Sequence, residues 1–426
     1  MGILVEIGSF IKLQRTKQAM TLGELSHGIV SLSYLSKIEN LKTEASPEII
    51  QLLCTRLGIQ IDNSMESAIK EKSRQWYSML FEVNDKEEII NTYEELQALL
   101  DKNLSDGLLL FEIHKIRYNL IIGKYDKALE KINELNKVSG TFDVEQQFYW
   151  FKFRGNYSSV TGDNFKQAML MYKHAEEKVN QLGLAEEEVA DLKYAISVTH
   201  SKLRNTLEAI DFANQAIDTF MKQYNFLRCA QCHIILGISY SRIKMYDKAI
   251  KNYNLAKHLG ELDNNKQVIQ LTNQNLGHLY STIGKSEEAI KYYVDVADDE
   301  EVQLNQRLAA LTSLIKEYYN ISNIEKTKEM ITKALAILDL AQKDVYYDLY
   351  HYMIHTYSYA INDEHEKFKS LVTDKFIPYL KKHKDYGNLV VYSNMLGSHF
   401  EKIGRYKESV RYYKLANLTY EELINL

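Results

Sequence analysis

The chain has 426 residues, of which 45% are hydrophobic and 26% charged, a composition that excludes a disordered protein. Its formal net charge of −5 excludes a protein that binds a polyanion through overall charge alone. Only two prolines are present, so few helices need be interrupted and we expect an almost entirely α-helical structure.

Three further absences narrow the class of protein. Three cysteines are too few for a disulfide framework, which indicates a reducing compartment. The opening residues lack a basic leader and a cleavage site, so we expect no signal peptide. No apolar run reaches about eighteen residues, the length of a membrane span. We therefore expect a protein of the cytoplasm that makes no contact with a membrane.

The residues up to Ile59 predict four short helices. Residues 7–16 carry an apolar stripe at helical spacing. Thr21 is followed three residues later by Glu24, which is the pattern of a capping box and predicts that a second helix begins here. Ser31 is a candidate cap for a third helix, and Pro47 suits the first turn of a fourth.

The stretch TLGELSHGIVSLSYLSKIEN…SPEIIQLLCTRLGI resembles the Xre/Cro-type helix-turn-helix, with Val30 and Leu41 standing where that family often has glycine. In the family, the second helix of the motif docks in the major groove of DNA. The resemblance implies that Glu39 braces the fold. It also implies contacts with base edges through Leu32, Ser33, Tyr34 and Lys37, and with phosphates through Thr21, Arg15, Lys12 and Asn40.

The charge of this segment limits how tightly one copy can bind DNA. Residues 1–62 contain six Lys or Arg and six Asp or Glu, so the segment is neutral. A neutral module neutralises few phosphates, and two copies on a palindrome are needed for useful affinity. A small helical scaffold that docks a protein instead of DNA is the alternative.

The rest of the chain contains internal repeats. Residues 236–256, 276–297 and 396–416 each have Leu-Gly, an aromatic residue three positions after the Gly, a small residue nine further on, and Tyr four later. This pattern resembles the tetratricopeptide repeat, a helical hairpin in which Gly and Ala let two helices approach closely. The small residue recurs about every 40 positions, at Ala128, Ala168, Ala209, Ala249, Ala289, Thr327 and Ser409.

The spacing predicts about nine hairpins. The gap between Thr327 and Ser409 spans two units, so a degenerate repeat is expected near residue 368, and another is expected over residues 70–103. HEAT repeats share the period of about 40 residues, but the Gly, Tyr and Ala positions favour the tetratricopeptide type. We therefore expect domains at 1–62 and 63–426, the second a right-handed superhelix of hairpins.

The first helices of such hairpins line a concave face that binds extended peptides. Asn275 is the strongest candidate contact, because an amide side chain can both donate to and accept from one peptide unit. Arg117 and Lys316 could hold a carboxylate or the C-terminus of the peptide. The other candidates, each with a solvated polar residue as the alternative, are Asn156, Tyr194, Gln231, Ile234, Gln274, His278 and Asn394.

Two other motifs are expected to carry no chemistry. Cys229 and Cys232 have the spacing of a redox or zinc pair, but they lie inside an expected helix with no second pair, so burial is the better interpretation. His351 and His355 share a helical face without a third ligand. We expect no metal, cofactor, catalytic residue or enzymatic activity.

The two halves together resemble the RRNPP peptide-pheromone receptors of Gram-positive bacteria. The resemblance implies a quorum-sensing transcription regulator whose groove binds an imported signalling oligopeptide, which changes its assembly and its binding to promoter DNA. It implies self-association as a dimer, with a tetramer in the presence of peptide left open. Two alternatives remain: a Rap-like sporulation inhibitor that binds a phosphorelay response regulator when free of peptide, and a scaffold whose helix-turn-helix is vestigial.

Overall fold

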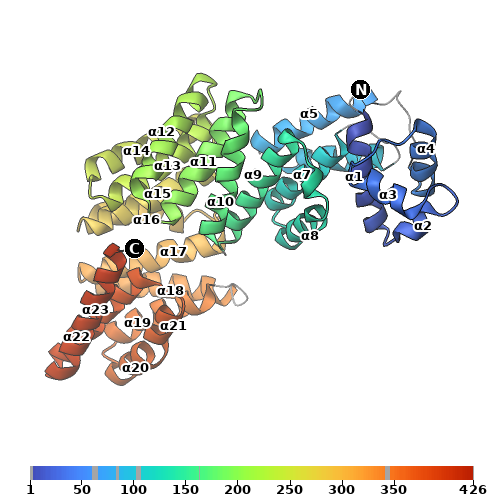
Figure 1. The fold of residues 1–426 in the computed structure, drawn as a ribbon. Helices are drawn as coiled ribbons and strands as arrows, with labels where there is room; N and C mark the ends of the chain where they lie inside the picture. The colour runs from blue at the N-terminus through green and yellow to red at the C-terminus, as the bar shows by residue number, and fades with distance from the viewer. Residues whose placement is uncertain are drawn as a thin grey trace. The chain divides into compact units, whose positions relative to one another are not determined.

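The computed structural model describes residues 3–59, 66–82, 86–101, 107–162, 164–340 and 346–425. Within these ranges every regular element is helical, which confirms the predicted class (Figure 1). The chain forms two compact units, Met1–Lys222 and Gln223–Leu426. The domain boundary expected at residue 62 lies outside the described residues and stays a prediction.

The first four helices are α1 (Ile3–Lys17), α2 (Leu22–Ser26), α3 (Leu32–Glu39) and α4 (Pro47–Arg56). The predicted capping box is present, since the Thr21 hydroxyl accepts from the Glu24 amide and the Glu24 side chain accepts from the Thr21 amide. The hydroxyl of Ser31 accepts from the Tyr34 amide at 3.2 Å, as expected of a cap. Pro47 stands in the first turn of α4. These caps satisfy N–H groups that have no partner within the helix.

Two positions in this segment are shaped by close backbone approach. A Cβ on Gly8 of α1 would lie 2.0 Å from the carbonyl oxygen of Ile38, so only glycine lets α1 cross α3 at this distance. Leu41 has φ +54°, the left-handed conformation that explains why related motifs place glycine there.

The remaining helices form nine hairpins within the described residues, and the degenerate repeat near residue 368 and the hairpin over residues 70–103 are both confirmed. Four hairpins belong to the first unit: α5 (Glu66–Glu82) with α6 (Lys86–Leu100), α7 (Leu108–Ile121) with α8 (Tyr125–Asn136), α9 (Val144–Thr161) with α10 (Phe165–Val179), and α11 (Glu186–Lys202) with α12 (Thr206–Lys222). A short 3-10 turn, η1 (Ser139–Thr141), follows α8.

Five hairpins belong to the second unit, and in four of them the second helix is continuous: α13 (Phe226–Arg242) with α14 (Tyr246–Leu262), α15 (Lys266–Thr282) with α16 (Ser286–Ala297), α17 (Leu304–Asn320) with α18 (Ile324–Leu340), and α22 (Tyr386–Lys402) with α23 (Tyr406–Asn425). In the degenerate repeat, α19 (Tyr347–Ile361) packs on a second helix made of three pieces: α20 (His365–Ser370), the π-helical η2 (Leu371–Phe376) and α21 (Ile377–Lys382).

The physical cause of the break is Pro378. Proline has no N–H to continue the hydrogen-bond ladder, and the wider π-helical turn accommodates the disruption immediately before it. This repeat also places the buried ring of Phe368 in the position that is a small residue elsewhere. The altered slot and the proline together explain why the sequence signal fades here.

In the hairpins with the clearest repeat pattern, a tyrosine ring lies against the recurring glycine. A Cβ on Gly277 would lie 2.6 Å from a ring carbon of Tyr293, and Gly237 stands in the same relation to Tyr253 at 2.4 Å. The same close approach joins Gly155 to Tyr172 and Gly397 to Tyr413. The predicted close approach of the two helices at the Gly is therefore confirmed, and the Tyr ring fills the space within its own hairpin.

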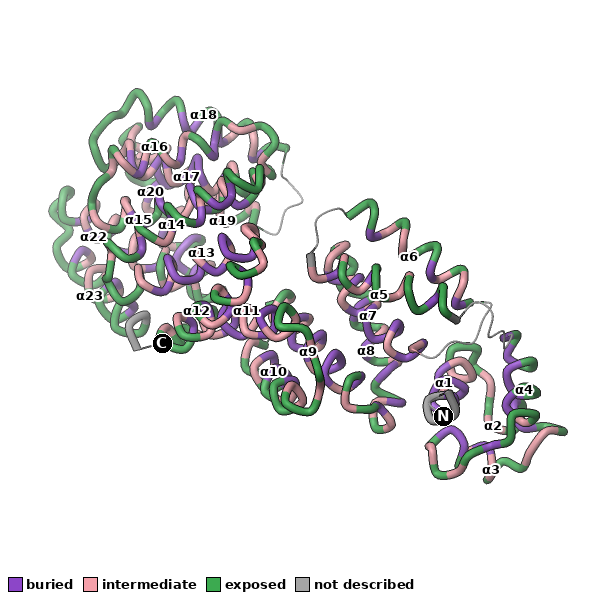
Figure 2. The backbone as a smooth tube through the Cα atoms, turned by 90° about the horizontal axis from the view of Figure 1, so that it is seen from above, coloured by how far each residue is buried: buried purple, intermediate pink, exposed green. Residues whose placement is uncertain are grey.

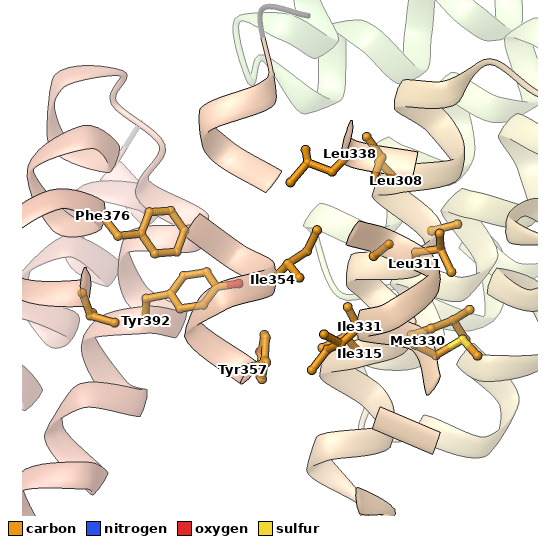
Figure 3. Packing of buried hydrophobic residues seen from close by; sticks show 14 of the residues in the cluster. Leu308, Leu311, Ile315, Met330, Ile331, Leu338, Ile354, Tyr357, Phe376 and Tyr392 are labelled. Carbon is orange, nitrogen blue, oxygen red and sulfur yellow. The ribbon is translucent and has the colours of Figure 1, made fainter. Parts of the chain in front are cut away.

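In several hairpins the first helix is more buried than the second. Buried positions are frequent along α7, α9 and α13, whereas α8 and α14 show more exposed turns (Figure 2). In the second unit the core surrounds α19, where Ile354 and Tyr357 lie between Phe376 and Tyr392 on one side and Ile315 on the other (Figure 3).

Helix α1 belongs to two cores at once. Ile11 packs in a cluster that contains Leu35 of α3 and also Phe111 of α7, while Leu13 packs in a second cluster around Phe148 of α9. The helix-turn-helix is therefore continuous in packing with the first repeats.

A buried carboxylate strengthens this junction. Glu112 of α7 is 3% exposed and contacts Lys17 of α1 at 3.0 Å, Lys115 at 3.1 Å and Lys131 of α8 at 2.6 Å. Burial alone would raise the pKa of Glu112, but the three lysines outweigh it and hold that pKa well below its usual range. The side chain stays charged and joins three helices.

We expect Gly277→Ala to destabilise the protein by roughly 1–3 kcal/mol, because the added methyl group overlaps the Tyr293 ring. Gly387→Ala is the matched control, since its Cβ would meet nothing closer than 3.9 Å. Chemical denaturation of both variants checks this. Equal stabilities of the two variants would contradict the steric account.

We expect Glu112→Gln to destabilise the first unit at pH 7 by roughly 3 kcal/mol, because Lys115 and Lys131, each with only 12% of its side chain exposed, lose their buried partner. Since the folded-state pKa of Glu112 is depressed, its contribution is present above about pH 4.3 and is lost as pH falls below it. The difference from wild type should narrow from pH 5 to pH 3 in denaturation experiments. Glu130→Gln, an exposed change on α8, should show no such dependence.

Candidate functional site

The surface that α3 offers to a partner contains most of the predicted base-edge residues. Leu32 is 56% exposed, and Ser33 and Lys37 are also exposed. Tyr34 is partly buried and its hydroxyl donates to the carbonyl of Glu44 at 3.2 Å. The opposite face of α3 is apolar and buried, as predicted. The face with Leu32, Ser33 and Lys37 is therefore the one that can contact a ligand.

Arg15, Glu39, Lys12 and Asn40 make contacts within the protein. Arg15 donates to both carboxylate oxygens of Glu39, at 2.6 and 2.8 Å, and to the carbonyl of Met20 at 2.8 Å. Glu39 is 2% exposed, which confirms that it braces the fold. The hydrogen bond to Glu39 raises the pKa of Arg15. Lys12 donates to Asn40 at 3.0 Å.

The predicted phosphate contacts differ in whether the side chain is exposed or already has a partner within the protein. Thr21 is exposed at the start of α2, next to the edge of α3. Arg15, by contrast, joins α1 to α3 through its ion pair with Glu39, a structural role that the sequence did not indicate. A phosphate contact through Arg15 stays a prediction.

Three predicted groove residues lie in the first unit, and two of them make internal hydrogen bonds. Asn156 is 7% exposed and accepts from the Tyr172 hydroxyl at 2.9 Å. Arg117 donates to the carbonyl of Leu80 at 3.3 Å. Tyr194 of α11 is partly buried. The structure therefore gives Asn156 a packing role, and a ligand role for these residues is untested.

The other candidates follow the first helices of the second unit. Gln274, Asn275 and His278 lie within two turns of α15, and Asn275 donates to the carbonyl of Leu271 at 2.8 Å. Ile234 is 4% exposed, whereas His278 and Asn394 are exposed. Gln231 accepts from Arg228 at 3.0 Å.

The structure brings His278 and Lys316 close enough to interact. The surrounding protein lowers the pKa of His278 even though solvent reaches the residue, and the charge of Lys316 lowers it further. Lys316 donates to the Ser281 hydroxyl at 3.2 Å. Adjacent first helices, α15 and α17, therefore present polar groups to one shared surface.

Sequence reasoning missed a group of residues next to this surface. Glu317 is 1% exposed and accepts from Ser281 and Ser286, each at 2.6 Å. A pocket of about 370 Å³ lies beside Lys316, lined partly by tyrosines and by His399. The sequence contains 31 tyrosines, a composition that was the available signal for an aromatic pocket.

Comparisons with known proteins agree with this architecture. The helix-turn-helix family matches residues 11–63, and the soluble NSF attachment protein family matches residues 159–331. The transcriptional activator NprA of Geobacillus stearothermophilus is 30% identical over 94% of this chain and 100% of its own length. The response regulator aspartate phosphatase A of Bacillus subtilis (strain 168) is 21% identical over 73% of this chain and 85% of its own.

Solved structures show the same fold. The apo form of the quorum sensor NprR from B. thuringiensis matches with a TM-score of 0.71 and 22% identity, covering 83% of this chain and 99% of that one. NprR in complex with its cognate peptide NprX matches with a TM-score of 0.59 and 23% identity, over 83% and 98% of the two chains.

Fold and similarity together define a transcription regulator with a helix-turn-helix and a helical repeat array. The chain belongs to the RRNPP family, as its similarity to the transcriptional activator NprA shows. No helix within the described ranges is both long enough and apolar enough to span a membrane.

We expect Glu39→Gln to loosen the helix-turn-helix by roughly 3 kcal/mol, because Arg15 then lacks its charged partner in a site where little solvent reaches it. Hydrogen exchange of the amides in α3 measures this local effect. Lys326→Met, which removes an exposed ion pair on α18, serves as the control and should leave exchange unchanged. Unaltered exchange in the Glu39 variant would refute the bracing role.

Proposed function

We propose that this regulator binds an imported signalling oligopeptide on the first-helix face of its repeats, and that binding changes how copies assemble and how they hold promoter DNA. The observation that supports it most is the full-length similarity to a transcriptional activator, joined to a fold shared with a structure solved with a peptide. On this proposal the DNA contacts are Leu32, Ser33, Tyr34 and Lys37, with Thr21, Arg15, Lys12 and Asn40 at phosphates.

The packing of α1 offers a route by which the repeats act on the DNA-binding segment. Leu13 is part of the repeat core and Lys17 contacts Glu112, so α1 must follow any movement of α7. Ser9 also donates to Thr141 in η1 at 2.5 Å. A ligand that favours one arrangement of the hairpins then favours one placement of α3.

The charge of the module supports regulation through assembly. Residues 1–62 carry no net charge, so one copy neutralises few phosphates and a pair on two half-sites gains much more affinity. A peptide that changes the spacing of two copies therefore changes DNA affinity without touching the DNA contacts.

A second function has separate support. Similarity to response regulator aspartate phosphatase A extends over 73% of this chain, including much of the repeat array. We propose as the alternative that the peptide-free chain binds a phosphorelay response regulator and so limits sporulation. On this alternative the two roles belong to one protein.

We expect Ser33→Ala with Lys37→Ala to lower DNA affinity at least about tenfold, because α3 loses its exposed hydroxyl and ammonium. The probe is double-stranded DNA selected from a random pool on the wild-type chain, and binding is measured by fluorescence anisotropy. Lys127→Ala, exposed on α8, controls for loss of one positive charge. Binding of a response regulator should survive the double change; undiminished DNA binding would remove α3 as the reading element.

We expect Asn275→Ala to weaken peptide binding about tenfold without unfolding, because Asn275 lies partly exposed on α15 beside Gln274 and His278. Synthetic peptides from a short reading frame adjacent to the gene are the probes, titrated by calorimetry. Asn254→Ala, exposed on α14, is the matched control. Equal affinities of the two variants would argue against a contact at Asn275.

A further inference from the structure

The pocket of about 370 Å³ in the second unit is bounded by α17, α19, α20 and α22. It lies next to Lys316, at the edge of the surface that carries His278. All of its lining residues belong to the described part of one compact unit.

One wall of the pocket is aromatic and fixed. Tyr357 is 3% exposed and lies among the residues of the core (Figure 3). Phe368 is 2% exposed and belongs to the same core, so both rings are held in place. Tyr319 packs edge-on against Tyr357 with ring centroids 5.2 Å apart. Met395 of α22 adds an adaptable apolar surface. The volume and this wall suit one large apolar side chain.

The polar part of the lining consists mainly of donors. Lys316 is held by Ser281 at 3.2 Å and by Glu317 at 3.8 Å, which positions its ammonium while leaving other N–H groups for a ligand. Lys402 is exposed on α22. The Nε2 atom of His399 is buried and has no hydrogen-bond partner among the described residues.

The environment keeps His399 neutral. Burial, with His365 and Lys402, lowers the pKa of His399. A neutral imidazole carries one N–H, and its ring lies with its centroid 4.7 Å from that of Phe368 and 5.2 Å from that of His365. In the tautomer that carries the proton on Nε2, an anion in the pocket would accept the hydrogen bond for which the described residues offer no partner.

The charge balance favours a single negative charge on the ligand. Lys316, Lys402 and Asp363 line the pocket, so its lysine and aspartate side chains carry one net positive charge. Glu317 lies 3.8 Å from the Lys316 ammonium and offsets part of that charge, which makes the pocket less suited to a ligand with two negative charges. No arginine is in the lining to form the bidentate pairs typical of phosphate sites. A carboxylate fits this balance better than a phosphate dianion.

We propose that this pocket binds a carboxylate carried beside a large apolar side chain, the chemistry of the C-terminal residue of a peptide. The apolar side chain lies against Phe368, Tyr357 and Met395, and the carboxylate accepts from Lys316, Lys402 and His399. The peptide source rests on the proposed function; a free N-acylated amino acid has the same chemistry. If the source is a peptide, its C-terminal end is placed at α19–α22 and its preceding residues along α15 and α17.

Small probes test the chemistry on the full chain. We expect N-acetyl-L-phenylalanine to bind saturably, measured by ligand-observed NMR, and N-acetyl-L-phenylalaninamide to bind about tenfold more weakly. N-acetylglycine, which keeps the carboxylate without the side chain, should also bind about tenfold more weakly. Equal affinities of the acid and its amide would overturn the proposal, as would absence of binding by the acid.

Variants locate the site. Lys402→Met and His399→Phe should each bring the affinity of the acid down toward that of the amide, while the affinity of the amide stays the same. A variant that misfolds would lose both probes, so a selective loss of the acid identifies the donors. Lys328→Met, exposed on α18 away from the lining, should bind as wild type does. Unchanged acid affinity in both pocket variants would refute the assignment.

Peptide probes separate this inference from the proposed function. A peptide from the adjacent reading frame should lose about tenfold in affinity when its C-terminus is amidated, and Lys402→Met should abolish that difference. Tight binding of acid and amide alike would overturn the pocket inference and leave the peptide receptor intact. If N-acetyl-L-phenylalanine binds but none of the peptides does, the result would support the pocket inference and reject a peptide as the source of the carboxylate.

Discussion

The repeat array depends on one steric constraint, a tyrosine ring that occupies the space where a Cβ would be. At Gly155, Gly237, Gly277 and Gly397 the ring lies within 2.9 Å of that position. The contact fixes how deeply the two helices of a hairpin approach, and the fully buried alanines such as Ala249 and Ala289 allow the same closeness on the second helix. Because the approach of the two helices in a hairpin is fixed in this way, polar residues of each first helix lie on one face. Successive hairpins together form a ligand surface from these faces.

A second constraint gives the DNA-binding segment its place. Helix α1 contributes Ile11 to one core and Leu13 to another, and Lys17 reaches the buried charge of Glu112. Arg15 and Glu39 then hold α3 to α1. Through these contacts the exposed face of α3 is linked to α7 by side chains that cannot shift independently, which is a requirement for regulation at a distance.

Local patterns made much of the fold predictable. Thr21 with Glu24, Ser31 and the Gly and Tyr spacing each report an interaction between residues near in sequence, so their outcomes were confirmed. The Arg15–Glu39 pair and the Glu112 cluster were not predictable, because a charged residue in a sequence does not show which distant partner buries it. The pocket was missed for the same reason: Lys316, Phe368 and His399 come together only after hairpins separated by about 40 residues stack.

The double membership of α1 bears on how the chain can be divided. A fragment cut near residue 62 would leave the repeats without Leu13, uncovering apolar surface around Ile113 and Phe148, and would leave Glu112 without one of its three cations. The excised helix-turn-helix would expose the face of α1 that packs on the repeats. The first repeats thus contribute part of the core on which the DNA-binding segment folds. If that segment is exchanged between relatives during evolution, both packed faces of α1 must be preserved.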